Sequence, residues 1–524
     1  MSSTSTLREA IRLALILAFL AGGLRAQEPP RMTPPAAPGG ARSGGPALPE
    51  EPPAYWMEKL STTRHTVRIG GVDVRYTATA GNLLLREEEG RARASIFFVA
   101  YTRDGVSDLA KRPVTFTFNG GPGSSSVWLH LGTFGPRRVR MDDEGMALPP
   151  PGGLVDNGDS LLDVTDLVFI DPVSTGYSRA IPEREAGRFH GVQEDIESVG
   201  EFIRLWTSRF GRWSSPKFLA GESYGTTRAA ALSRYLQSND GMYLNGVILI
   251  SSILNFQTTD FNVGNDLPYA LFLPTYTATA WYHKRLPADL QGDLRKALDE
   301  SRRFALGDYT LALAQGSRLD ADARGRIAGQ LSRLTGLSPE FLVQVNLRAD
   351  ISAFTKELLR DRRLTVGRLD SRFQGSDLAA AGAAFEYDPS YAAIQGPFTA
   401  ALNDYVRREL GYSSDLPYEI LTDRVDPWSY GMFANQYVNV AEDLRKAMTQ
   451  NPALRVFIAS GYYDLATPFF ATDYTFDHLG FEPFYAERVT QTYHEAGHML
   501  YIRKVEREKL KADLAAFLRK ASGE

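Results

Sequence analysis

The residues best suited to covalent chemistry lie in segment 217–225, K-F-L-A-G-E-S-Y-G, where Ser223 is the centre of a G-x-S-x-G motif. An apolar run precedes the motif, and a helical pattern from Thr226 to about Leu236 follows it. A sharp turn from strand to helix lifts a serine hydroxyl clear of the sheet, and small flanking residues prevent a clash there. The following helix directs its N-terminal amides towards a developing anion. We therefore predict that Ser223 is a nucleophile and that the protein is a hydrolase.

An acid and a histidine that could activate Ser223 occur further along the chain. Asp464 follows the apolar run 455–460, and His498 lies in a loop before the last helical pattern. Serine is a poor nucleophile until an imidazole takes its proton, and the acid fixes the tautomer of that imidazole. The chain order serine, acid, histidine is that of α/β-hydrolases. Ser223, Asp464 and His498 are thus predicted to form a catalytic triad.

A glycine-rich segment, N-G-G-P-G-S-S-S at 119–126, directly follows another apolar run. Glycine lets the backbone approach a ligand closely, so we predict that the amides of Gly121 and Tyr224 form an oxyanion hole. The segment lacks the lysine and the spacing of a phosphate-binding loop. Its position after a strand favours a catalytic role over a simple turn.

The elements that must position these residues follow an α/β pattern. Near-continuous apolar runs at 114–118, 167–170 and 247–250 are typical of strands buried on both faces, and the helical pattern 192–210 supplies a crossover. Alternation between 65 and 104 predicts antiparallel hairpins at one edge of the sheet. We therefore predict an α/β-hydrolase fold with a mostly parallel central sheet.

The domain organisation follows from changes of character along the chain. Residues 256–425 are helical, charged and rich in Leu and Ala, which predicts a helical cap inserted into a core of residues 55–255 and 426–524. A cap over the carboxyl ends of the strands would shape substrate access. The chain closes with an amphipathic helix at 505–521.

The chain begins with a segment typical of secretory signals. Arg8 and Arg12 precede an apolar run, and residues 1–26 are predicted to be a signal peptide cleaved after Ala26, although an uncleaved anchor is the alternative. Residues 27–54 are rich in Pro and Gly and predict a disordered leader. We expect export to the periplasm or the medium, with no membrane span after cleavage. With no cysteine, the fold must stand without disulfides, and a net charge of -4 gives no reason to expect nucleic acid as a partner.

Taken together, these motifs resemble those of the serine carboxypeptidases. The N-G-G-P-G-x-S-S motif of that family matches 119–126, G-E-S-Y matches 221–224, and G-x-x-D and G-H-M match 461–464 and 497–499. The resemblance implies an α/β-hydrolase that removes C-terminal residues from peptides through an acyl-enzyme, with no cofactor or metal. It also implies that Asn119 and Glu222 help to bind the terminal carboxylate of the substrate.

One position departs from the pattern of this family. Its members carry a second glutamate in an E-x-G-P segment, where this chain has Thr133. Two close carboxyls can share a proton and so present a donor to an anionic substrate, whereas a lone Glu222 is expected to ionise more readily and repel it. We hypothesise that a cation such as Arg137, Arg138 or Arg228 compensates and shifts activity towards neutral pH.

Several alternatives remain open from the sequence. Loss of carboxylate specificity would leave an esterase or amidase, and acyl transfer would use the same triad. A binding protein could keep the fold without turnover. The segment 494–498 also fits H-E-x-x-H, a zinc protease pattern, but Gly497 weakens the helix that this pattern requires, and Glu506 is expected on an exposed helix face.

Overall fold

The structure, a computed structural model, describes residues 53–480 and 487–523 of the chain. The predicted signal peptide and nearly all of the predicted leader lie outside these residues. Within them, no helix is long and apolar enough to cross a membrane.

A 10-stranded sheet forms the centre of the molecule, in the order β1-β2-β3-β7-β4-β9-β10-β13-β14, with β8 paired to β3. The strands from β7 to β14 in this order run parallel, whereas β1, β2 and β3 form antiparallel pairs at one edge, as the alternating pattern predicted. The strands of this sheet are β1 (Lys59–Ile69), β2 (Val72–Arg86), β3 (Ala92–Arg103), β4 (Val114–Phe118), β7 (Asp166–Ile170), β8 (Arg179–Ala180), β9 (Lys217–Ser223), β10 (Gly246–Ser252), β13 (Arg455–Gly461) and β14 (Val489–His494). Short ladders join β5 (Arg137–Val139) to β6 (Leu154–Asp156) and β11 (Thr365–Val366) to β12 (Gln374–Gly375).

Helices cover both faces of the sheet, which explains why its central strands are apolar without interruption. In β10, Val247 and Leu249 belong to one buried cluster, whereas Ile248 and Ile250 belong to another on the opposite face. Successive side chains of a strand point to opposite faces, so a strand covered on both sides needs apolar residues at every position. The predicted fold class is therefore confirmed.

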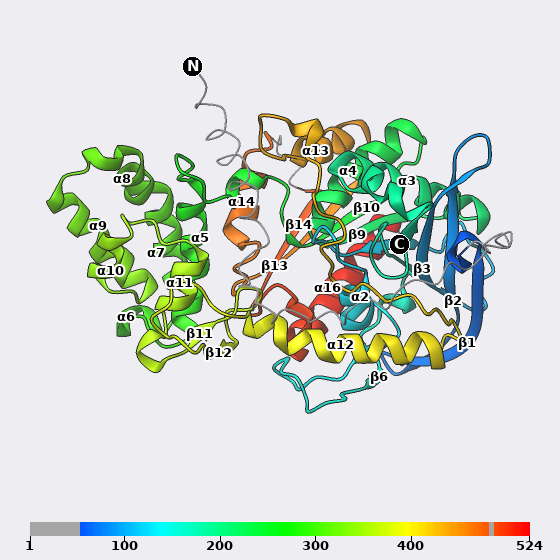
Figure 1. The fold of residues 1–524 in the computed structure, drawn as a ribbon, viewed down its shortest axis with the longest axis horizontal. Coiled ribbons are helices and arrows are strands. Elements are labelled where there is room, and N and C mark those ends of the chain that lie inside the picture. The colour runs from blue at the N-terminus through cyan, green and yellow to red at the C-terminus, as the bar shows by residue number, and fades with distance from the viewer. Residues whose placement is uncertain (1–52, 481–486, 524) are drawn as a thin grey trace, which may run out of the picture.

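Figure 1 shows α3, α4 and α13 on one side of the sheet and α16 and α12 on the other. The helices are α2 (Val127–Leu129), α3 (Val192–Arg209), α4 (Tyr224–Asn239), α5 (Leu267–Tyr282), α6 (Ala288–Gln291), α7 (Leu294–Phe304), α8 (Thr310–Gln315), α9 (Ala321–Thr335), α10 (Pro339–Gln344), α11 (Ile351–Glu357), α12 (Pro389–Arg408), α13 (Ala441–Gln450), α14 (Phe469–Asp477) and α16 (Lys504–Ser522). Two short helical turns near the site are η2 (His130–Phe134) and η10 (Leu500–Ile502).

The helical block 256–425 contains two structurally different parts. Helices α5 to α11 form a lobe beside the core and share an apolar cluster with Tyr463, Leu465 and α14 (Figure 1). Helix α12 packs instead into the main core, where Phe398 and Leu402 join the cluster that contains Trp128. We retain 256–425 as the proposed insertion, with α12 attached to the core.

The carboxyl ends of the parallel strands carry the residues singled out in the sequence. Asn119 follows β4, Ser223 ends β9, Asp464 follows β13, and His498 lies in the loop after β14. Because parallel strands end at the same edge of a sheet, these residues come from four loops that lie next to one another.

Candidate active site

The turn at Ser223 has the strained backbone of a nucleophile elbow. Ser223 has a φ of 60° and a ψ of -132°, a conformation that non-glycine residues rarely adopt. A Cβ atom added at Gly221 would lie 2.1 Å from the carbonyl oxygen of Gly225, and one at Gly225 would lie 2.8 Å from that of Phe118. The two glycines of the motif are therefore required by close packing of the turn against itself and against β4.

The glycine-rich loop after β4 rests on the N-terminus of α4. A Cβ atom at Gly120 would lie 2.3 Å from the amide nitrogen of Tyr224, and Gly121 has a φ of 111° that favours glycine. Arg228, on α4, donates from Nη1 to the carbonyl oxygen of Asn119 at 2.7 Å. The loop that carries the Gly121 amide is thus fixed beside the Tyr224 amide, and their use as an oxyanion hole remains a prediction.

Asp464 and His498 form a hydrogen-bonded pair. The Asp464 Oδ2 atom lies 2.8 Å from His498 Nδ1, and the carboxylate also accepts hydrogen bonds from the amides of Ala466 and Thr467. The Thr467 hydroxyl donates to Oδ2 at 2.7 Å and lies 3.2 Å from His498 Nδ1. The acid is held rigidly, so it can fix the imidazole with Nδ1 as donor and leave Nε2 available as a base.

His498 lies close to the nucleophile turn without a hydrogen bond to it. The Ser251 hydroxyl, on β10, donates to the carbonyl oxygen of His498 at 2.7 Å, and the next residue, Ser252, pairs with Ser223 in the sheet. Among the described residues, no hydrogen bond joins the Ser223 hydroxyl to the His498 ring. Such contacts are often long in an enzyme without substrate and tighten in the complex. The contact between Ser223 and His498, which would complete the triad, thus remains a prediction.

A segment of the helical block, residues 368–371, holds both the acid loop and the histidine loop. Asp370 accepts from the amide of Gly497 at 3.1 Å, and the carbonyl oxygen of Leu369 accepts from the amide of His498 at 2.7 Å. At the loop of Asp464, the amide of Leu465 donates to the carbonyl oxygen of Arg368, and the amide of Ser371 donates to the carbonyl oxygen of Tyr463. Gly497 also allows close approach, since a Cβ there would lie 2.4 Å from that of Asp370.

Glu222, beside the nucleophile, is fully buried and hydrogen-bonded. It accepts from the Tyr501 hydroxyl at 2.5 Å and is also hydrogen-bonded by Asn119. Burial raises the pKa of Glu222 to about 7, even though the His498 charge and the Tyr501 hydrogen bond act in the opposite direction. Our expectation that a lone Glu222 ionises readily is therefore wrong, because burial disfavours the charged form of its carboxyl.

The pKa of His498 is raised above its ordinary value. Burial opposes protonation of the ring, but the charge and hydrogen bond of Asp464, assisted by the Glu222 charge, more than offset it, while the Arg368 charge lowers the pKa. A base must be neutral to accept a proton, so a role of His498 as the base would require a pH above the ordinary titration of histidine.

The arginines proposed to compensate for Thr133 have other partners. Arg228 pairs with Asp195 in a fully buried ion pair at 2.7 Å. Arg137 binds Asp156 and Glu409, and Arg138 donates to a backbone carbonyl. None of the three is a hydrogen-bond partner of Glu222 in the described part of the chain, so the hypothesis of a compensating cation among them is not supported by their contacts.

The H-E-x-x-H alternative requires a helix that the chain does not form there. His494 ends β14 and His498 lies in the loop that follows, so the two rings do not share a helical face. His494 Nδ1 instead lies 2.9 Å from Glu506 Oε2. The expectation of an exposed Glu506 is wrong, because the residue is only 8% exposed under this contact. In residues 53–480 and 487–523, no cluster of three or more His, Cys, Asp or Glu side chains could hold a metal ion.

Sequence reasoning missed Tyr501, Thr467 and Asp370. Thr467 lies within the predicted acid loop and could have been proposed as a partner of Asp464 from its spacing of three residues. Tyr501 and Asp370 contact residues 279 and 127 positions away, respectively, so no local pattern indicates them.

Known proteins resemble this chain in sequence. A family model described as serine carboxypeptidase matches residues 74–508. Serine carboxypeptidase-like 29 of Arabidopsis thaliana is 26% identical over 34% of this chain and 35% of its own length. The pheromone-processing carboxypeptidase KEX1 of Yarrowia lipolytica is 28% identical over 36% of this chain and 28% of its own. The matches therefore span about a third of these curated relatives.

A solved structure shares the fold over a greater length. The prohormone-processing carboxypeptidase KEX1 of Saccharomyces cerevisiae superposes with a TM-score of 0.52 and 17% identity, covering 83% of this chain and 91% of that one. At this identity the likeness concerns the fold alone.

Proposed function

The chain belongs to the serine carboxypeptidase family, and from this membership we propose that it is a serine-type carboxypeptidase that removes C-terminal residues from peptides. The observation that carries the proposal is the 2.8 Å hydrogen bond between Asp464 and His498, formed at the same edge of the sheet as the strained turn at Ser223. A binding protein would need neither of these features, since both serve to activate a hydroxyl.

The proposed reaction proceeds through an acyl-enzyme. His498 Nε2 takes the proton of Ser223 as Oγ attacks the scissile carbonyl carbon, and the amides of Gly121 and Tyr224 stabilise the oxyanion. The C–N bond then breaks, and His498 returns the proton to the leaving amine. In the second half, His498 takes a proton from water as the water oxygen attacks the ester carbon; the bond from that carbon to Ser223 Oγ then breaks, and His498 returns the proton to Oγ. Asp464 balances the charge on the imidazole in both halves.

Recognition of a free C-terminus is proposed to depend on Glu222 and Asn119. A pKa of about 7 leaves Glu222 protonated at acidic pH, so it can donate a hydrogen bond to a carboxylate instead of repelling it. A C-terminal amide or ester requires no such donor. An esterase, an amidase or an acyltransferase would share the triad but would not prefer the free acid.

A panel of one N-blocked dipeptide, its C-terminal amide and its ethyl ester tests this proposal. We expect the free acid to have the highest kcat/KM at pH 6, and a serine-directed phosphonate, but not a chelator, to abolish activity. Ser223→Ala should lower kcat by at least about 10³-fold while leaving thermal unfolding unchanged. Equal rates on acid and amide would indicate an amidase or esterase, and turnover that survives Ser223→Ala would exclude the triad.

Export and a peptide partner complete the proposal. The predicted signal peptide at residues 1–26 lies outside the described residues, so export is inferred from its sequence pattern. Cleavage after Ala26 predicts that the N-terminal residue of the mature protein is Gln27, which N-terminal sequencing of secreted material would check.

A further inference from the structure

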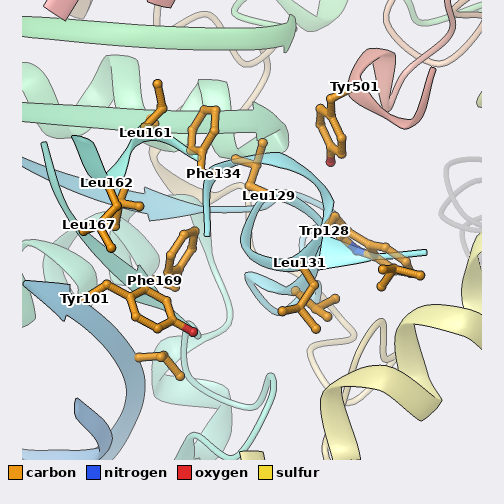
Figure 2. Packing of buried hydrophobic residues seen from close by; sticks show 14 of the residues in the cluster. Tyr101, Trp128, Leu129, Leu131, Phe134, Leu161, Leu162, Leu167, Phe169 and Tyr501 are labelled. Atoms are coloured by element: carbon orange, nitrogen blue, oxygen red, sulfur yellow. The ribbon is translucent and has the colours of Figure 1, made fainter. Parts of the chain in front are cut away.

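The Tyr501 side chain is a direct hydrogen-bond partner of Glu222, together with Asn119. Tyr501 lies in η10, is completely buried, and donates its single hydroxyl proton to Glu222 Oε2 at 2.5 Å. Figure 2 shows its hydroxyl pointing towards the segment that carries Trp128 and Leu129. The phenol thus approaches Glu222 from the C-terminal part of the chain, although the position of the family glutamate lies in η2.

The η2 turn is built to accept the Tyr501 ring. A Cβ atom added at Gly132 would lie 2.3 Å from Cε2 of Tyr501, closer than real Cβ contacts allow. Only glycine therefore fits against the ring without displacing it. Gly132 directly precedes Thr133, which stands where the family has its second glutamate. The η2 turn therefore lacks that carboxyl and leaves room for the Tyr501 ring beside it.

We propose that Tyr501 is the positioning residue for Glu222, and that it confines the binding of peptides with a free C-terminal carboxylate to the acidic side of neutrality. This rests on the proposed function, because it concerns how Glu222 recognises a carboxylate. Tyr501 acts through Glu222 and does not contact the substrate.

The chemistry of a phenol differs from that of a second carboxyl in one respect. A carboxyl can share a proton with Glu222 in either direction, whereas the Tyr501 hydroxyl has one proton, which it gives to Oε2. The proton of a neutral Glu222 then sits on Oε1, free to be donated to a substrate. Burial and the Glu222 charge raise the pKa of Tyr501 well above its ordinary value, so the phenol stays neutral throughout the working range.

The Tyr501 hydrogen bond favours the ionised form of Glu222. Hydrogen bonds to a charged acceptor are stronger than those to a neutral one, so this bond lowers the pKa that burial raises. The other titratable groups acting on Glu222 are His498, which lowers its pKa, and Asp464, which raises it. Removing the hydroxyl should consequently keep Glu222 protonated to higher pH.

The test is the pH dependence of KM for an N-blocked dipeptide and for its C-terminal amide. In the wild-type enzyme we expect KM for the acid to rise above about pH 7 and KM for the amide to stay level. In Tyr501→Phe the rise should move upward by about one pH unit, since one unit corresponds to a tenfold change in proton affinity. At a pH where His498 is fully neutral, the kcat for the amide should change less than about threefold, as the triad is intact.

A matched control and a second variant keep the test decisive. Tyr309→Phe removes another buried hydroxyl, which donates to the carbonyl oxygen of Leu347 at 2.6 Å in the helical lobe, and should leave the KM profile unchanged. Gly132→Ala keeps the Tyr501 hydroxyl but displaces the ring, and should shift the profile in the same direction as Tyr501→Phe.

Each outcome has one meaning. An upward shift in Tyr501→Phe and Gly132→Ala, without one in Tyr309→Phe, supports the proposal. If Tyr501→Phe does not fold, Gly132→Ala alone decides it. Superimposable or downward-shifted profiles overturn it. If the wild-type enzyme itself shows no preference for the free acid, the proposed function fails instead.

Discussion

Replacing Asp370 should impair catalysis from outside the triad. Asp370 belongs to the helical block, yet its carboxylate accepts from the amide of Gly497, next to the base His498. It also binds the guanidinium of Arg372 at 2.7 Å, and this ion pair is buried, with 4% and 3% of the two side chains exposed. Asp370→Ala therefore removes one of the hydrogen bonds of the histidine loop and deprives a buried cation of its buried partner.

The two effects have separate magnitudes. Loss of one partner from a buried ion pair destabilises a protein by about 3–5 kcal/mol, and Glu144, 59% exposed at 3.4 Å from Arg372, offsets little of this. A displacement of the imidazole by about 1 Å can lower the rate by about 10²-fold. The His498 amide keeps its bond to Leu369, so we expect kcat to fall by about 10-fold to 100-fold and KM to change little.

A buried ion pair elsewhere provides the control. Asp377 and Lys356 pair in the helical block with 2% and 3% of their side chains exposed. Asp377→Ala should lower stability by a similar amount and leave kcat unchanged. Asp370→Asn keeps an acceptor for Gly497 but loses the charge, so it should lower stability with less effect on rate.

Urea unfolding and steady-state kinetics on the blocked amide, both well below the unfolding temperature, measure the two quantities. The reasoning is refuted if Asp370→Ala lowers stability as much as Asp377→Ala does but keeps kcat within twofold of that control. It is also refuted if KM alone changes, because Asp370 is not expected to contact the substrate.

Three other changes act on the site itself. Asp464→Asn should lower kcat by about 10⁴-fold without unfolding the protein, because an amide cannot hold the imidazole in the required tautomer, and circular dichroism with kinetics checks this. Arg368→Gln removes an exposed cation that lowers the pKa of His498, so the acid limb of kcat for an amide substrate should move to higher pH; a shift to lower pH contradicts the assignment. Glu222→Gln removes a charge that raises the pKa of His498, so it should move the acid limb of kcat to lower pH. It should also make KM for the free acid independent of pH above neutrality, and a rise of KM that persists at alkaline pH would mean that another group titrates.

The sequence predicted those parts of the site that depend on local pattern. The turn at Ser223, the glycines at 120 and 121 and the loop of Asp464 each follow a strand within a few residues, so their spacing alone indicates their geometry. The sheet was predictable for the same reason, because burial on both faces leaves uninterrupted apolar runs such as 247–250.

The contacts that tune the site were not predictable because they join distant segments. Tyr501 reaches Glu222 across 279 residues, and Asp370 reaches Gly497 across 127. The sequence has Thr133 where the resemblance implies a glutamate, and it suggested a cation in compensation. Burial instead raises the pKa of Glu222, and the depth of burial of one side chain cannot be read from its neighbours in the chain.

The charge of Glu222 raises the pKa of His498, and the charge of His498 lowers the pKa of Glu222, so a single pH optimum is a poor measure of either group. Cleavage of a free acid requires a protonated Glu222 and a neutral His498. The inactive state with an ionised Glu222 and a protonated His498 holds the same number of protons, so pH alone does not separate the two states. Cleavage of the matched amide requires only the neutral His498. The ratio of kcat/KM for acid and amide therefore cancels the state of His498 and reports the fraction of Glu222 that is protonated while the imidazole is neutral.

This ratio has a definite expected form. A glutamate with the ordinary pKa of 4.5 would be roughly 0.3% protonated at pH 7, whereas a pKa of about 7 leaves about half of it protonated. The His498 charge lowers the pKa of Glu222, so with a neutral imidazole the midpoint should lie no lower than about pH 7. Above it the ratio should fall about tenfold per pH unit. A midpoint near pH 4.5 would mean that Glu222 is solvated in the working enzyme, and the acid-recognition role assigned to it would then require another donor.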